Sequence, residues 1–195
     1  MSTIDSQRRR VGLKIVYYGP GMSGKTTNLR AIYSHMGAEK RGKLVSRRVK
    51  GQEDLYVDLL PISLGTIEGF DATLHLCTVP GHALYNEVRQ LMLKGVDGVV
   101  FVADSRGSRM AANEDSLDSL EENLGHYDVR LESLSHVLQY NKRDLPGASD
   151  LAQMRMKLNR YNVPEFTATA LNSQGVVPTL KAIVDLVRGE VRKRL

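Results

Sequence analysis

The sequence lacks the features that mark secreted or membrane-spanning proteins. It has a single cysteine, Cys77, so no internal disulfide can form and no cysteine-based metal site is expected. No run approaches the roughly 18 apolar residues that a membrane span requires. The first residues contain no apolar signal core, residue 2 is not glycine, and the last residues contain no cysteine for prenylation. We therefore expect a cytoplasmic protein without a stable membrane anchor.

The composition is that of an ordinary globular domain. The chain has 195 residues, of which 42% are hydrophobic and 25% are charged, which suits one domain with a full core. Its net charge is +5, and its five histidines show no ligand spacing. A basic balance can indicate nucleic acid or an anionic surface, but solvated tails and a cationic helix end explain it more simply. We expect one domain over 1–195, with a flexible basic tail over 1–10 and no nucleic-acid partner.

Strand-like and helical patterns alternate along the chain. The patterns predict strands over 13–18, 55–60, 72–79, 98–103, 135–140 and 165–170, and helices over 24–36, 110–124, 149–160 and 180–191. The second and third strands are expected to pair antiparallel through a connection containing Pro61, Gly65 and Gly69, and Ser149 or Asp150 should cap its helix. This alternation predicts a three-layer α/β fold, with a six-stranded, mostly parallel sheet and helices on both faces. Ligands bind such sheets at the carboxyl ends of the strands.

A glycine-rich motif follows the first predicted strand and opens the first helix. It matches G-x-x-x-x-G-K-S/T in full, the pattern of a phosphate-binding P-loop. Glycines let backbone N–H groups curl around phosphate oxygens, and the helix N-terminus adds positive potential. Lys25 supplies a charge to the β and γ phosphates, and the Thr26 hydroxyl can ligate Mg²⁺. The predicted phosphate-binding residues are Gly19, Gly21, Met22, Ser23, Gly24, Lys25, Thr26 and Thr27.

A second motif, N-K-x-D at 141–144, follows the strand that ends at Tyr140. A carboxylate at Asp144 can accept hydrogen bonds from guanine N1–H and the N2 amino group, which adenine cannot supply. Asn141 can reach N7 of the base, and the stem of Lys142 can cover the ring. This pattern predicts a guanine site and disfavours an ATPase or kinase.

The segment Thr169-Ala170-Leu171 follows the last predicted strand and supports the base site. It occupies the place of the S-A-K loop of small GTPases, in which the alanine N–H meets guanine O6. We therefore add Ala170 and Leu171 to the predicted nucleotide site.

With these motifs the chain resembles the Ras-like small GTPases, and within them the bacterial MglA group of cell polarity and gliding motility. The resemblance implies a Ras-like P-loop NTPase fold. The resembling stretches cover nearly the whole chain, and Thr78-Val79-Pro80-Gly81 is distinctive, because Ras-like proteins have D-x-x-G there whereas the MglA group has Thr. The stretches are 14–21, 24–29, 78–81, 93–104 and 139–146.

The resemblance implies a GTP/GDP switch that uses Mg²⁺. It also implies a roadblock/LC7-type, MglB-like regulator and downstream polarity or motility effectors, which could recruit the protein to a cell pole. By the same resemblance Gly81 joins the nucleotide site, and Lys25 and His82 take the catalytic positions.

The sequence departs from the MglA group at its hydrolytic positions. Where that group has a water-orienting Gln, this chain has His82, and where it has an Arg–Thr pair, this chain has Glu53 and Asp54. An arginine finger contributes about 10³- to 10⁵-fold in rate, so we expect slow hydrolysis without a partner.

Two placements of Glu53 and Asp54 stay open. Asp54 can join Thr26 as a Mg²⁺ ligand, or both carboxylates can point to solvent; a cation from residues 47–50 could replace the arginine. A non-hydrolysing, nucleotide-bound interaction module is the alternative function.

Overall fold

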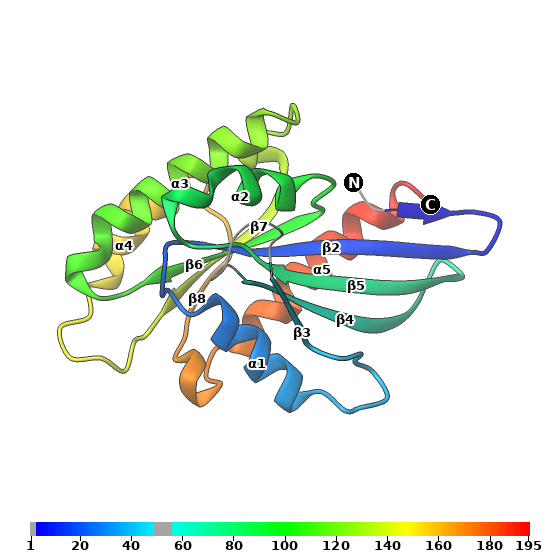
Figure 1. Cartoon of the computed structure of the whole chain (residues 1–195), viewed down its shortest axis with the longest axis horizontal. Helices are drawn as coiled ribbons and strands as arrows, with labels where there is room; N and C mark the ends of the chain where they lie inside the picture. The colour runs from blue at the N-terminus through cyan, green and yellow to red at the C-terminus, as the bar shows by residue number, and fades with distance from the viewer. Residues whose placement is uncertain (1–2, 49–55) are drawn as a thin grey trace.

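The computed structural model describes residues 3–48 and 56–195. Within them lies one eight-stranded sheet in the order β3-β4-β5-β2-β6-β7-β8, with β1 paired to β2 (Figure 1). Strands β2, β5, β6, β7 and β8 run parallel to their neighbours in that set, while β1, β3 and β4 pair antiparallel. The strands are β1 Thr3–Asp5, β2 Arg10–Tyr18, β3 Val45–Arg48, β4 Tyr56–Ile67, β5 Phe70–Thr78, β6 Gly98–Asp104, β7 Ser135–Asn141 and β8 Glu165–Thr167.

The predicted α/β class is confirmed, and the sheet has two more strands than the six we expected. The additional strands, β1 and β3, are short, and every residue of β3 is exposed. They therefore lack the apolar alternation by which a buried strand is recognised in a sequence. Strand β1 lies within the segment that we predicted as a tail: residues 3–5 pair with residues 10–12 as a hairpin.

The antiparallel pair β4–β5 is confirmed, but its connection is shorter than predicted. Strand β4 runs through Pro61 and Gly65, so the turn consists of Glu68 and Gly69. The Pro61 carbonyl oxygen accepts from the Gly42 N–H at 2.9 Å, so its ring nitrogen also faces residues 40–42 and the ladder with β5 loses no hydrogen bond there. At Gly65, with φ +72°, the register shifts by a bulge.

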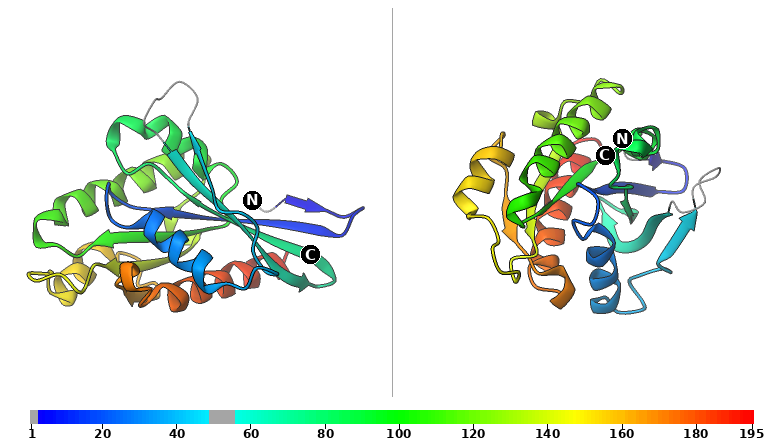
Figure 2. Two further views of the ribbon diagram at one scale, coloured as in Figure 1. Left: turned by 60° about the horizontal axis from the view of Figure 1, so that its bottom comes forward. Right: turned by 60° about the vertical axis from the view of Figure 1, so that its left-hand side comes forward.

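Five α-helices in the described residues cover the two faces of the sheet (Figures 1 and 2). Odd-numbered residues of β2 pack with α1 and α5 on one face, and Val16 and Tyr18 pack with α2, α3 and α4 on the other. This two-sided burial explains the continuous apolar run of β6, which is buried at every position. The helices are α1 Lys25–His35, α2 Asn86–Leu93, α3 Met110–Gly125, α4 Leu151–Leu158 and α5 Val176–Arg192.

The helix predictions agree with the structure to within a few residues. Asp150 caps α4 by accepting a hydrogen bond from the Gln153 N–H at 3.2 Å. Strand β8 ends at Thr167, three residues earlier than predicted, and Ala170 begins a 3₁₀ helix, Ala170–Asn172. No helix in the described part of the chain is long and apolar enough to cross a membrane.

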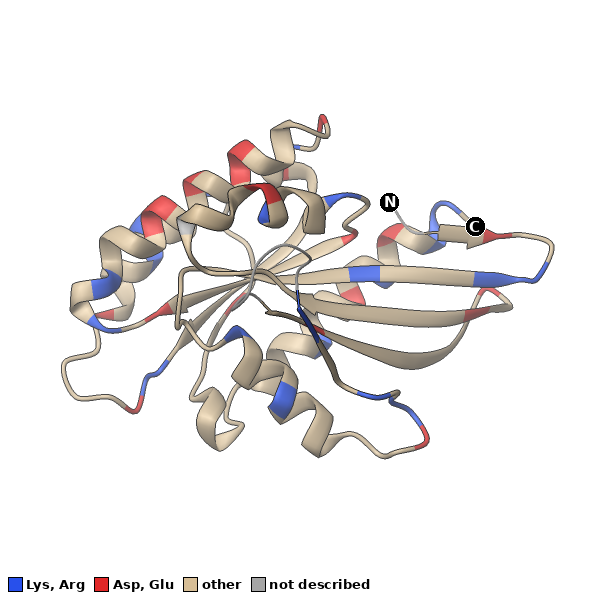
Figure 3. Ribbon diagram, viewed as in Figure 1, with Lys and Arg blue, Asp and Glu red and all other residues tan. Residues whose placement is uncertain are grey.

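Every charged residue of helix α3 is a carboxylate, and these side chains lie mainly on the side away from the sheet (Figure 3). Several of them form ion pairs with the segment around α4: Lys157 of α4 pairs with Glu114 at 3.0 Å, and Arg160, which follows α4, pairs with both Asp118 and Glu121. These pairs are partly exposed, so each contributes little stability; their effect is to align α4 along α3.

Candidate functional site

The predicted motifs meet at one edge of the sheet. The P-loop follows β2, the N-K-x-D motif begins at the last residue of β7, and Ala170 follows β8. Because these strands are parallel, their carboxyl ends share an edge, where α/β proteins bind ligands. The fold therefore brings together residues that lie about 120 to 150 positions apart in the sequence.

Glycine is required at two positions of the P-loop. Gly19 has φ +141°, and a Cβ there would lie 2.2 Å from the Val102 carbonyl oxygen. Gly24 has φ +105°, and a Cβ there would lie 2.2 Å from Asn141 Nδ2. Both positions need a left-handed backbone and contact atoms of neighbouring strands. The loop is thus held closely against β6 and β7.

Lys25 is buried under this loop, with 7% of its surface exposed. Its Nζ donates to the carbonyl oxygens of Gly19 at 2.8 Å and Pro20 at 2.7 Å. Burial, together with the smaller effects of the nearby charges of Arg89 and Lys142, lowers the pKa of Lys25 to about 7. A bound anion would favour the charged form of this ammonium group.

Two cavities adjoin the P-loop and share Met22, Gly24 and Thr27. The first, which we call the P-loop cavity, has a volume of about 280 Å³ and reaches Lys25, Thr26, Tyr56 and residues 78–81. The second, the β7–β8 cavity, has a volume of about 350 Å³. Its remaining lining residues are Asn141, Lys142, Asp144, Leu145, Ala170 and Leu171.

Asn141 joins the loops around these cavities. Its Nδ2 donates to the Ser23 carbonyl oxygen at 2.8 Å, and its Oδ1 accepts from the Ala170 N–H at 2.9 Å. Both polar atoms are thus engaged within the protein, and the side chain is almost fully buried. This links the P-loop to the β8 loop, and because the amide nitrogen carries a second N–H, the expected contact with N7 of a base stays a prediction.

Lys142 is held by a carboxylate that sequence analysis did not identify. Its Nζ lies 2.8 Å from Oδ2 of Asp104, the fully buried last residue of β6. Burial alone would raise the pKa of Asp104, but hydrogen bonds from Arg106 and Lys142 outweigh it and lower the pKa. The ion pair fixes the direction of the Lys142 stem along the β7–β8 cavity. The only signal in the sequence was an acidic residue ending an apolar strand.

Asp58 on β4 is the second residue that sequence analysis missed. Its Oδ2 accepts from the Thr26 hydroxyl at 2.6 Å, and its Oδ1 accepts from the Ser46 hydroxyl at 2.5 Å. The Asp58 N–H donates to Thr78 Oγ1 at 3.0 Å. The carboxylate is buried, so a negative charge lies beside Thr26 although position 78 itself carries a hydroxyl.

The predicted metal position is only partly described. Thr26 lines the P-loop cavity, whereas Asp54, like Glu53, lies outside the described residues. Within the described residues no three His, Cys, Asp or Glu side chains gather closely enough to hold a metal ion. The oxygen donors Thr26 and Asp58 suit Mg²⁺, which keeps several waters and takes further ligands from substrate phosphates.

His82 lies beside the P-loop cavity rather than in its lining. The side chain is exposed, its Nδ1 accepts from the Leu84 N–H at 3.3 Å, and the ring borders a neighbouring cavity between α2 and α3. The cavity lining next to the P-loop ends at Gly81. In this arrangement His82 caps the turn that leads into α2.

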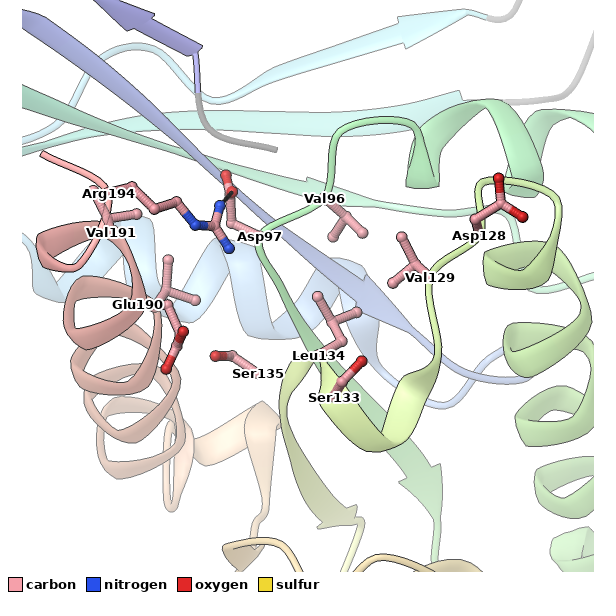
Figure 4. Close-up of a pocket in the computed structure, with 11 residues that line it drawn as sticks. Val96, Asp97, Asp128, Val129, Ser133, Leu134, Ser135, Glu190, Val191 and Arg194 are labelled. Carbon is pink, nitrogen blue, oxygen red and sulfur yellow. Dashed lines mark ion pairs between the residues drawn. The ribbon is translucent and has the colours of Figure 1, made fainter.

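A further cavity of about 230 Å³ lies at the opposite edge of the sheet (Figure 4). It is bordered by the segments that precede β6 and β7 and by the end of α5, and the Arg194 guanidinium points toward Asp97, 3.8 Å from its Oδ1. The Asp97 carboxylate also accepts from the Lys14 N–H at 2.9 Å. None of the residues predicted to bind nucleotide lines this cavity.

Comparison with known proteins places these features in context. No family model matches the chain. The chain is 50% identical over 193 residues to the mutual gliding-motility protein MglA of Myxococcus xanthus, across 99% of both chains. It is also 38% identical over 69 residues to the GTPase Obg of Anoxybacillus flavithermus, covering 35% of this chain and 16% of that protein. The first similarity extends nearly end to end, and the second is confined to one stretch.

Proposed function

The chain belongs to the MglA-type small GTPases, and on this premise we propose that it is a guanine-nucleotide-binding switch of cell polarity or motility. The whole chain acts as one G domain in the cytoplasm. The observation that carries the proposal is the β7–β8 cavity, because P-loop residues, the N-K-x-D motif and the β8 loop line it together. Its volume lies in the range of small-ligand sites.

In the proposed complex the phosphates occupy the P-loop cavity and the base occupies the β7–β8 cavity. The P-loop N–H groups from Gly21 to Thr27 and the Lys25 ammonium contact the phosphates. Asp144 accepts from the guanine N1–H and N2 groups, Lys142 covers the ring, and the Ala170 and Leu171 backbone borders its O6. Gly81 contacts the terminal phosphate, as the family resemblance implies.

Mg²⁺ is proposed to bind at Thr26. The ion contributes charge neutralisation between the β and γ phosphates when it is bound. Asp58 supports this assignment, because its buried carboxylate accepts a hydrogen bond from the Thr26 hydroxyl and so leaves the oxygen lone pairs of Thr26 for the P-loop cavity. In the same proposal Asp54 is a further ligand of this ion.

Hydrolysis of GTP is proposed to be slow in the chain alone, since Glu53, Asp54 and His82 replace the group's hydrolytic residues. The exposed His82 and its turn-capping hydrogen bond support this, because a water-orienting group must face the terminal phosphate. The catalytic contributions are then those of Lys25 and, after movement of its turn, His82. The alternative, a non-hydrolysing interaction module, shares the same nucleotide site.

Partners follow from family membership. We propose a roadblock/LC7-type, MglB-like regulator and polarity or motility effectors, which could bring the protein to a cell pole. Single-turnover hydrolysis with and without such a regulator distinguishes the switch from the non-hydrolysing module. Acceleration by the regulator supports the switch; a rate equal to that of free GTP under both conditions contradicts it. Glu53→Arg should restore turnover if the missing arginine is limiting.

The base assignment is tested by Asp144→Asn. This change replaces an acceptor of two charged hydrogen bonds with an amide, so GDP affinity should fall about a hundredfold. The matched control is Asp128→Asn, an exposed carboxylate at the opposite edge of the sheet, which should leave the affinity unchanged. Fluorescent-GDP titration measures both; equal affinity in the two variants would overturn the assignment.

A further inference from the structure

The cavity between α2 and α3 that His82 borders lies directly beside the P-loop. We call it the α2–α3 cavity; its volume is about 500 Å³. Pro20, Gly21 and Gly81 form one wall, and Asn86, Ser116 and Ser119 contribute polar groups to the others. It contains two arginines, Arg89 and Arg109, against one carboxylate, the exposed Asp115. The cavity therefore has a net positive charge on its inner side.

Arg89 is a buried cation without a counterion in the described part of the chain. It is only 3% exposed, and its guanidinium lies 4.7 Å from the centre of the Tyr18 ring. Its Nη2 donates to Ser116 Oγ at a long 3.4 Å, and its Nε has no hydrogen-bond partner among the described residues. None of the ion pairs found there involves it. A buried, incompletely satisfied charge is costly unless an anion compensates it.

Arg109 brings a second guanidinium to the P-loop wall of the same cavity. Its Nη2 donates to the Gly21 carbonyl oxygen at 3.0 Å, while its Nε is buried and has no partner among the described residues. The charge of Arg89 is close enough to Lys25 to lower the pKa of that residue, after the larger effect of burial. The two arginines thus extend the positive region beneath the P-loop toward α3.

A thin wall separates this cavity from the P-loop cavity. Gly81 lines both cavities, and a Cβ at Gly81 would lie 2.4 Å from the Gly21 backbone nitrogen and Cα. The closely packed backbone of Gly81 and Gly21 therefore forms part of the wall between the position proposed for the terminal phosphate and the two arginines. A small displacement of Gly81 away from Gly21 would connect the two spaces.

We infer that the α2–α3 cavity is a second phosphate-binding site, in which Arg89 and Arg109 hold inorganic phosphate next to the nucleotide. The inference rests on the proposed function, because inorganic phosphate is a product of the GTP hydrolysis that this function includes. In GTP hydrolysis a water oxygen bonds to Pγ as the bond from Pγ to the β-phosphate bridging oxygen breaks. GDP keeps that bridging oxygen and its electron pair, and both water hydrogens leave with the phosphate. The product then passes Gly81 into the cavity.

Titration of the GDP-loaded protein with inorganic phosphate tests this site, because the β-phosphate of GDP already fills the P-loop. Calorimetry and ³¹P NMR should show saturable binding at millimolar phosphate. Loss of one charged hydrogen-bond donor in Arg109→Gln should weaken it about tenfold or more. Arg89→Gln should weaken it similarly. The matched control, Arg130→Gln, removes an exposed arginine whose ion-pair partner among the described residues is Glu132, and it should leave phosphate binding unchanged.

Three results would overturn the inference. They are the absence of saturable binding, binding that the Arg109→Gln variant retains in full, and binding that disappears in Lys25→Met but survives both arginine changes. The last result would place the phosphate in the P-loop alone. Arg109 is partly exposed, so its variant remains decisive if Arg89→Gln does not fold.

Failure of the proposed function is a separate outcome. If the protein binds no GDP, the guanine-nucleotide assignment is lost, and the α2–α3 cavity is tested on the nucleotide-free Lys25→Met variant, in which capture of phosphate by the P-loop is removed. Phosphate binding there that depends on Arg109 would retain the site, and its absence would overturn it.

Discussion

Lys25 is the residue whose protonation should most directly affect nucleotide binding. Its pKa of about 7, set first by burial and then by Arg89 and Lys142, means that the free protein loses this proton through neutral pH. A bound phosphate stabilises the ammonium form, so the complex keeps the proton to higher pH. The free protein then carries fewer protons than the complex above pH 7.

It follows that GDP binding takes up protons and weakens as the pH rises above about 7. The uptake should be about half a proton at pH 7 and should approach one proton at about pH 8.5. Calorimetry in buffers of different ionisation enthalpy measures this number. Zero uptake across that range would show that Lys25 is already fully charged in the free protein.

Asp58 is the residue for which we predict an effect on the metal. Asp58→Asn leaves one acceptor oxygen for the two hydroxyls of Thr26 and Ser46 and removes the buried charge, so Mg²⁺ affinity of the GDP complex should fall about tenfold. Asp185→Asn, an exposed change on α5, is the control. Magnesium titration of nucleotide release measures both variants, and equal midpoints would remove Asp58 from the site.

The sequence identifies only some of these residues. The P-loop and N-K-x-D spacings, with the resemblance of residues 169–171 to the S-A-K loop, predicted all the residues that line the β7–β8 cavity except Leu145, because each motif follows the end of a strand. Asp58, Asp104 and Arg89 belong to no such pattern. Their importance depends on which strands and helices are neighbours, and this is set by tertiary pairing rather than by local spacing.

At the scale of elements, the connection from β8 to α5 supports the base side of the site. Gly175 has φ +73° as the N-cap of α5, and a Cβ there would lie 2.1 Å from the Thr167 carbonyl oxygen. The same loop carries Ala170, whose N–H donates to Asn141. The start of α5 is therefore linked to the β7–β8 cavity through the backbone.

Two glycine substitutions at α5, one at its N-cap and one in its body, should change the stability of the protein in opposite directions. Gly175→Ala should destabilise the protein by about 1–3 kcal/mol, because both the positive φ and the contact with Thr167 oppose a Cβ. Gly189→Ala, in the body of α5 with no heavy atom within 4 Å of its added Cβ, should stabilise it by up to about 1 kcal/mol. Urea unfolding of both variants measures the difference; changes of equal sign would contradict this account of the helix start.

The strands show which elements a sequence can reveal. The fully buried β6 was predicted almost to its ends, because its apolar run follows from burial on both faces. Strands β1 and β3 were missed, since short and exposed residues carry no periodic signal. Strand β4 extended further than predicted because its pairing with β5 continues through Pro61, whose ring nitrogen faces away from β5, and past a bulge at Gly65.

At the scale of the whole molecule, the two edges of the sheet differ in chemistry. One edge gathers the P-loop, the N-K-x-D motif, the β8 loop and the α2–α3 cavity, and the other carries the small cavity closed by Arg194 (Figure 4). A ligand that binds only the folded chain stabilises all of it by mass action, about 2.7 kcal/mol at 100 times Kd. The preference for one nucleotide over another can therefore be measured by how much each nucleotide stabilises the folded protein against unfolding.

The most direct test of the central claim is thermal unfolding of the purified protein with Mg²⁺ and either GDP or ADP at equal concentration. A guanine site built on Asp144 predicts that GDP raises the unfolding temperature by several degrees, as expected for about 2–3 kcal/mol of ligand stabilisation, and that ADP leaves it unchanged. An equal rise with both nucleotides would contradict the guanine assignment and leave a phosphate-binding protein without base selectivity.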